Sequence, residues 1–148
     1  MDTQRLAQLI DAKLAIATKL LELAERQLAV INENDLSSLL RLLAGKQQLV
    51  DQLAMLDQAL APLARQEPGD RRWASPQAHA RCRQQQLRCE ATLRELLAVE
   101  QEAESRMLEQ RTATAQRLTT MQHAGQAQQA YAAGPAVQLA TLDLTSES

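Results

Sequence analysis

The sequence predicts an all-α fold, an elongated antiparallel helical hairpin followed by a long third helix, so that the whole resembles a coiled-coil-like three-helix bundle. Apolar residues, leucine above all, recur at alternating spacings of three and four through most of the chain, which is the period of helices packed lengthwise. Trp73 and Tyr131 are the only aromatic residues. Most of the four glycines and four prolines lie outside or at the ends of the apolar runs, which leaves little room for a sheet.

The first apolar run ends just before Asn32 and has the pattern of one arm of a hairpin. Its seam is Ala7, Ile10, Leu14, Ala17, Leu21, Ala24, Leu28 and Ile31. A second row lies beside this seam and consists of Leu9, Ile16, Leu23 and Val30. A stripe this broad predicts contact with more than one neighbouring helix.

The second run repeats the pattern after a short polar link, Asn32 to Asp35. Its seam is Leu39, Leu42, Lys46, Leu49, Leu53, Leu56, Leu60 and Leu63, in which Lys46 is the one interruption. Asn34 or Asp35 is placed to cap the second helix, so residues 1–64 are predicted to form an antiparallel hairpin. We expect Pro62 to kink or finish this helix and Pro68-Gly69 to prevent its continuation, which gives a loop over residues 65–75.

Ser75 followed by Pro76 predicts the start of a third helix, with serine as the N-cap and proline at the first helical position. We expect this helix over residues 76–130. About 50 residues of helix span roughly 75 Å, whereas each arm of about 30 residues spans roughly 45 Å, so part of the third helix is expected to lack a partner within the chain. Its apolar positions are Leu93, Leu97, Ala103, Met107, Leu108, Ala115, Leu118 and Met121. Residues 131–148 are predicted to be a flexible tail.

Composition indicates one domain with an ordinary surface. The 45% of apolar residues suffice for an elongated core, and the net charge of −2 is too small to dictate a polyanionic or polycationic partner. Charge is nevertheless uneven, because residues 65–94 sum to +4 and residues 95–109 to −4. These blocks could pair head to tail in a homodimer or could form a solvated face. The N-terminus lacks the features of a signal peptide, and no membrane insertion is expected, so the predicted location is the cytoplasm.

The chain carries no motif of an enzyme active site, and we expect no catalytic residue, cofactor or metal. His79 and His123 complete no Glu-x-x-His pair, and Glu100 with Glu104 is expected to be a solvated pair one turn apart. Cys82 and Cys89 are too far apart on one helix for a disulfide and are predicted to be reduced core thiols. No nucleic acid is expected as a partner, because the basic segment beside Trp73 contains a single aromatic residue, which we expect to pack against the bundle.

The hairpin sequence resembles the helix-turn-helix of the FlgN-type flagellar export chaperones of bacteria. The matching residues are Asn34-Asp35-Leu36-Ser37-Ser38-Leu39, then Lys46-Gln47-Gln48-Leu49-Val50 and Leu53. The long third helix and the segment Tyr131-Ala132-Ala133-Gly134 are also similar to the end of that family. The resemblance covers nearly the whole chain.

The resemblance implies a cytosolic, non-enzymatic chaperone. Its clients would be the C-terminal helical parts of the hook–filament junction proteins FlgK and FlgL, which it would deliver to the flagellar type III export machinery. Because the C-terminal part of the family carries client recognition, the implied binding residues are Met107, Leu108, Ala115, Leu118, Met121 and Tyr131. Lys46 matches the family lysine, and we expect it to have a structural role. The alternative is a homo-oligomeric coiled-coil structural or tethering protein, in which the third helix pairs with a second copy.

Overall fold

A computed structural model of the chain describes residues 2–133, and these residues form three long helices. They are α1 (Asp2–Glu33), α2 (Leu36–Ala64) and α3 (Pro76–Ala133), with one 3-10 turn, η1 (Pro68–Asp70), between α2 and α3. Residues 2–133 contain no strand, so the predicted all-α class is confirmed. Gly125 does not interrupt α3, which continues past the predicted end at residue 130. The rest of the predicted tail, residues 134–148, lies outside the described residues.

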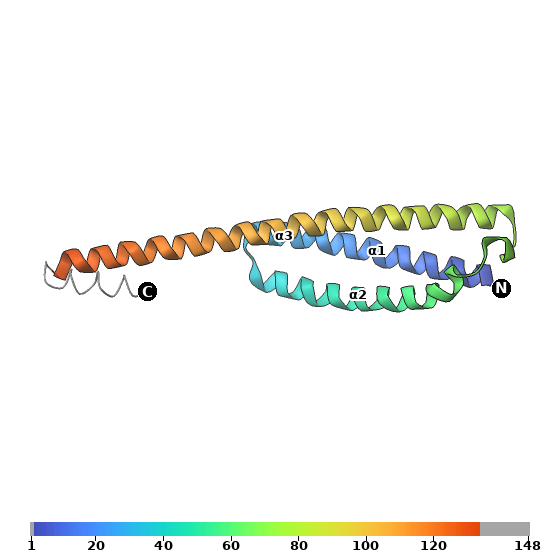
Figure 1. Cartoon of the computed structure of the whole chain (residues 1–148), viewed down its shortest axis with the longest axis horizontal. Helices are drawn as coiled ribbons and strands as arrows, with labels where there is room; N and C mark the ends of the chain where they lie inside the picture. The colour runs from blue at the N-terminus through green and yellow to red at the C-terminus, as the bar shows by residue number, and fades with distance from the viewer. Residues whose placement is uncertain (1, 134–148) are drawn as a thin grey trace. The chain divides into compact units, whose positions relative to one another are not determined.

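The helices belong to two structural units. The first unit, Met1–Arg106, contains α1, α2, η1 and the first part of α3, and the described part of the second unit is the helix from Met107 to Ala133. Within the first unit α1 and α2 are antiparallel, and α3 runs alongside α1 (Figure 1). α1 and α2 therefore form an antiparallel hairpin, with a third helix packed on it.

α1 supplies most of the core of the first unit. Seven of the eleven buried apolar residues among those described belong to this helix, and they are Leu6, Leu9, Ile10, Ala17, Leu20, Ala24 and Ile31. Ala17 and Ala24 at its middle are fully buried, and such small side chains let neighbouring helices approach closely. The broad stripe of α1 thus serves two neighbours, as its width predicts.

The most buried line of α1 differs from the predicted seam by one residue at three positions. Ile10, Ala17, Ala24 and Ile31 are buried as expected. Buried residues stand beside the other expected seam positions, with Leu6, Leu20 and Gln27 buried while Ala7, Leu21 and Leu28 are half-buried; Lys13 and Leu14 are both half-buried. The reason is that α1 packs against two helices, so the row that faces between them is buried most deeply. Sequence spacing alone favours the more apolar row.

Two buried clusters attach the ends of α1 to α3. At one end Leu6 and Ile10 of α1 pack with Cys82 of α3, and at the other end Ile31 of α1 packs with Leu39 of α2 and Ala103 of α3. The predicted α2 seam is buried at Leu39 and half-buried at its other seven positions, so it faces the bundle as expected. Of the third-helix positions, Ala103 is buried, Leu93 is half-buried and Leu97 is exposed, so Leu97 does not belong to the packed face.

The link between α1 and α2 is a tight turn set by Asn34. This residue has a φ of 59°, the left-handed conformation that asparagine tolerates, and its N–H donates to the Ile31 carbonyl while the Asp35 N–H donates to the Val30 carbonyl. This is a Schellman motif, which satisfies the last carbonyls of α1. Asp35 then caps α2 by accepting from the Ser38 N–H (3.1 Å) and hydroxyl (2.7 Å), and these hydrogen bonds lower the pKa of its carboxyl.

The loop over residues 65–75 is tied to the helix ends on both sides. Ser75 caps α3 as predicted, because its hydroxyl accepts from the Ala78 N–H at 3.0 Å. The guanidinium of Arg71 donates to the Leu63 carbonyl at the end of α2 (2.9 Å), and the hydroxyl of Thr3 in α1 donates to the Arg72 carbonyl (2.7 Å). Pro62 lies inside α2, and the helix ends two residues after it. These contacts hold the loop against the end of the bundle.

Candidate functional site

The described part of the second unit presents apolar side chains to solvent. Between Met107 and Ala133 no residue is buried. The exposed fractions are 56% for Leu118, 69% for Met121 and 90% for Tyr131, and Met107, Leu108 and Ala115 are exposed as well. All six residues that the resemblance implies are therefore accessible to a partner.

Five of these six residues share one face of the helix. At about 100° per residue, Met107, Leu108, Ala115, Leu118 and Met121 fall within a sector of about 140°. By the same count Tyr131 lies about 80° beyond the Met121 edge of this sector. We call the five residues the apolar face. A single helix laid along it could touch all five, whereas Tyr131 would need a separate contact.

Two polar residues on or beside the apolar face were not predicted, because the sequence analysis followed the spacing of apolar residues only. Arg111 lies at the middle of the apolar face by the same helical count and is exposed, so the face carries one cation. Thr119, at the edge beside Ala115, donates its hydroxyl to the Ala115 carbonyl at 3.0 Å, so this hydroxyl is bonded within the helix. Leu108, Arg111 and Ala115 line one surface hollow. The signal for Arg111 was present, because it follows Leu108 by three residues and precedes Leu118 by seven.

Lys46, the residue that matches the family lysine, forms an ion pair with Glu100 of α3. Both side chains are more than two-thirds buried, which places the pair between α2 and α3 rather than on the surface. The expectation that Glu100 and Glu104 form a solvated pair is wrong for Glu100, because spacing along one helix says nothing about a lysine on another. Glu104 is exposed as expected.

Replacement of Lys46 by methionine should destabilise the first unit. The substitution keeps the apolar stem but leaves the largely buried Glu100 carboxylate without its partner, which should cost about 1–2 kcal/mol. Urea unfolding followed by circular dichroism measures the change. The double variant Lys46→Met with Glu100→Met should regain most of the loss, and additive losses in the double variant would show that the ion pair has no role.

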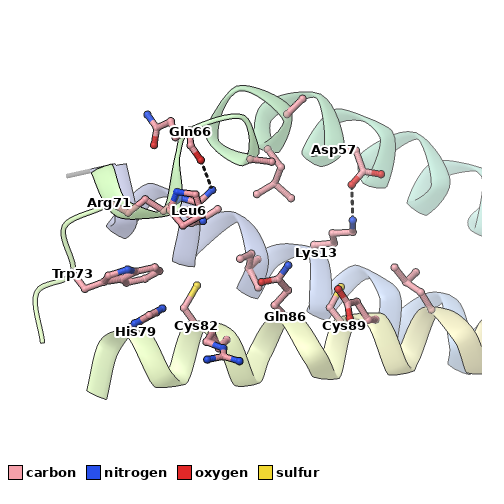
Figure 2. Close-up of a pocket in the computed structure, with 18 residues that line it drawn as sticks. Leu6, Lys13, Asp57, Gln66, Arg71, Trp73, His79, Cys82, Gln86 and Cys89 are labelled. Carbon is pink, nitrogen blue, oxygen red and sulfur yellow. Dashed lines mark hydrogen bonds and ion pairs between the residues drawn. The ribbon is translucent and has the colours of Figure 1, made fainter. Parts of the chain in front are cut away.

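A cavity of the first unit lies between the three helices and the loop that contains η1. Its volume is about 590 Å³. Figure 2 shows Arg71, Trp73, His79 and Cys82 at one end of it, and the Lys13–Asp57 ion pair (2.7 Å) with Cys89 at the other. The indole of Trp73 stacks on the His79 ring with centroids 4.6 Å apart, so Trp73 packs against the bundle as expected.

Cys82 and Cys89 are both buried and both free, as predicted for reduced core thiols. Burial raises the pKa of both thiols; the Asp11 carboxylate adds to the rise at Cys82, and the Lys13 ammonium partly offsets it at Cys89. Protonated thiols are weak nucleophiles, so both cysteines should react slowly at neutral pH. Among the described residues no three histidine, cysteine or acidic side chains gather as a metal site would require.

Comparison with known proteins identifies the family of the chain. The model of the FlgN protein family matches residues 1–135. Neither the curated proteins nor the solved structures contain a significant match. None of the helices within residues 2–133 is long and apolar enough to cross a membrane. FlgN proteins are a chaperone family rather than an enzyme family. Because the match covers nearly all of the sequence, the chain belongs to the FlgN family, and membership supports a role as a flagellar export chaperone.

Proposed function

We propose that this protein binds the C-terminal helical parts of the hook–filament junction proteins FlgK and FlgL in the cytoplasm and delivers them to the flagellar type III export machinery. The observation that carries the proposal is the apolar face, five exposed apolar side chains on one side of a helix that has no buried residue after Met107. Exposed apolar patches of this kind mark surfaces for partners. Family membership supports the choice of an export client as that partner.

The mechanism that fits this surface is the docking of an amphipathic client helix. The client would lay its own apolar stripe along the apolar face, so that both surfaces leave water together. Met107 and Met121 suit this task, because the flexible, polarisable methionine side chain adapts to more than one partner shape. A client helix that is covered in this way cannot associate with other clients before export.

The second candidate is a homo-oligomeric tether in which the apolar face pairs with another copy of itself. The same exposure favours it, since self-pairing also removes the apolar side chains from water. Electrostatic attraction between the opposed charge blocks over residues 65–94 and 95–109 would add to the contact between such copies. The two candidates differ in what happens when a client is added.

Size-exclusion chromatography with light scattering separates the two candidates. We expect the protein and a C-terminal segment of a hook–filament junction protein to elute as one mixed complex, and any self-associated species to dissociate as that complex forms. An unrelated amphipathic helix of equal length and charge is the control. An oligomer whose mass is unchanged by an excess of client would contradict the chaperone and support the tether.

A further inference from the structure

The cavity of the first unit has the size and the lining of a small-molecule site. Its volume of about 590 Å³ lies within the range of ordinary ligand pockets, roughly 300–1,000 Å³. Leu6 and Ile10 of α1, Leu60 of α2 and Leu93 of α3 contribute to an apolar wall, and Trp73 closes one end. An apolar body of several carbon atoms would find van der Waals partners on three helices.

The charged groups that line this cavity are not equivalent. Lys13 and Asp57 neutralise each other at one end, where their ion pair is 2.7 Å long. Arg71, Arg83 and Glu90 remain, and within residues 2–133 Arg83 forms no ion pair or hydrogen bond. The lining therefore keeps one net positive charge, and its cations include Arg71 at the end opposite the Lys13–Asp57 pair (Figure 2).

Among the cavity residues, Arg71 has the hydrogen-bonding groups that say most about the ligand. Its terminal nitrogen Nη2 donates to the carbonyls of Leu63 (2.9 Å) and Gln66 (3.4 Å), which orients the guanidinium. Its Nε is buried, and among the described residues it has no hydrogen-bond acceptor. A buried donor without an acceptor costs free energy, and a carboxylate supplies the acceptor of matching geometry and opposite charge.

The geometry points to a site for a small amphiphile with an apolar body and one carboxylate. The carboxylate accepts from Arg71 at the end closed by Trp73, and the body extends along the apolar wall toward Cys89. This site lies in the first unit, and binding there does not involve the apolar face of the second unit.

The chain contains one tryptophan and two cysteines, and all three line this cavity. The fluorescence of Trp73 and the alkylation rates of Cys82 and Cys89 are therefore local reporters of whatever enters it. Burial and the raised pKa of both thiols keep their reaction slow, so an occupant that covers them should slow it further.

Octanoate titration into the full chain, followed by Trp73 fluorescence, tests the site. We expect a saturable change with octanoate, at least tenfold weaker binding of 1-octanol, and slower alkylation of both cysteines by N-ethylmaleimide in the presence of octanoate. Equal affinity for octanoate and octanol would overturn the proposal, as would the absence of a saturable response.

Three variants locate the interaction. Arg71→Met should weaken octanoate binding about tenfold and bring it to the level of octanol, whereas Arg72→Met, an exposed neighbour that does not line the cavity, should leave it unchanged. Ala61→Phe should place a ring in the cavity and abolish binding without the loss of any charge. Because Arg71 also holds the loop, its variant is compared at equal helicity. Octanoate binding that survives Ala61→Phe would show that the ligand sits elsewhere.

Discussion

Replacement of Leu118 and Met121 together by aspartate should abolish co-purification of the client segment. Both side chains are more than half exposed and lie within the apolar face, so the free protein loses no packing when they are changed. In the complex the new carboxylates would be buried against apolar client residues without partners, which should weaken binding by at least about a hundredfold. Pull-down with a tagged client segment measures the effect, and circular dichroism should show unchanged helicity.

A matched variant, Gln116→Asp with His123→Asp, controls for the added charge. Both residues are exposed, and by helical count they lie on the side opposite the apolar face. We expect this variant to bind the client as the parent does. Equal loss of client binding in the two variants would mean that net charge, and not the apolar face, decides binding. Undiminished binding by the Leu118 and Met121 variant would contradict the assignment of the apolar face to the client.

A separate Tyr131→Asp variant measures whether Tyr131, which lies outside the sector, makes its own contact with the client.

Replacement of Leu20 by alanine should destabilise the first unit more than any other single change considered above. Leu20 is 1% exposed and is the largest fully buried side chain among the described residues. Its truncation removes buried methyl groups and leaves a cavity between helices that cannot fully close, which costs about 2–5 kcal/mol. The free energy of unfolding from urea titration measures the loss.

Leu40→Ala in α2 is the control for this core variant. Leu40 is 60% exposed, so the same chemical change should cost less than about 0.5 kcal/mol. If the two variants lost equal stability, Leu20 would not lie at the packed centre of the bundle. A loss at Leu20 without any loss of client binding would further show that the two units act separately.

Local chemistry predicted the helices well. The Ser75-Pro76 start of α3 and the cap of α2 by Asp35 follow from hydrogen bonds within a few residues, so short sequence patterns suffice to find them. The family was also within reach, because the resemblance uses residues of the hairpin that can be read in order; the family model matches residues 1–135. The exposure of Leu118 and Met121 followed from the unequal lengths of the helical runs.

Features that depend on which helix lies opposite were harder to predict. Periodicity identified the stripe of α1 but centred it on Leu21 rather than Leu20, because the direction of the second neighbour is not encoded in the spacing of one helix. The partner of Glu100 on α2 was missed for the same reason. The cavity was missed because Arg71, Trp73 and Cys82 meet only when the loop folds back over the bundle.

The ion pair of Lys46 and Glu100 favours one register of α2 against α3. Every other position of the α2 seam is leucine, and leucine seams pack almost equally well after a slip of one heptad. A slip of seven residues along α3 would bring Leu93 to the place of Glu100, so both charges would be left half-buried and alone. One lysine in a row of leucines thus excludes the misaligned bundles that its neighbours would permit.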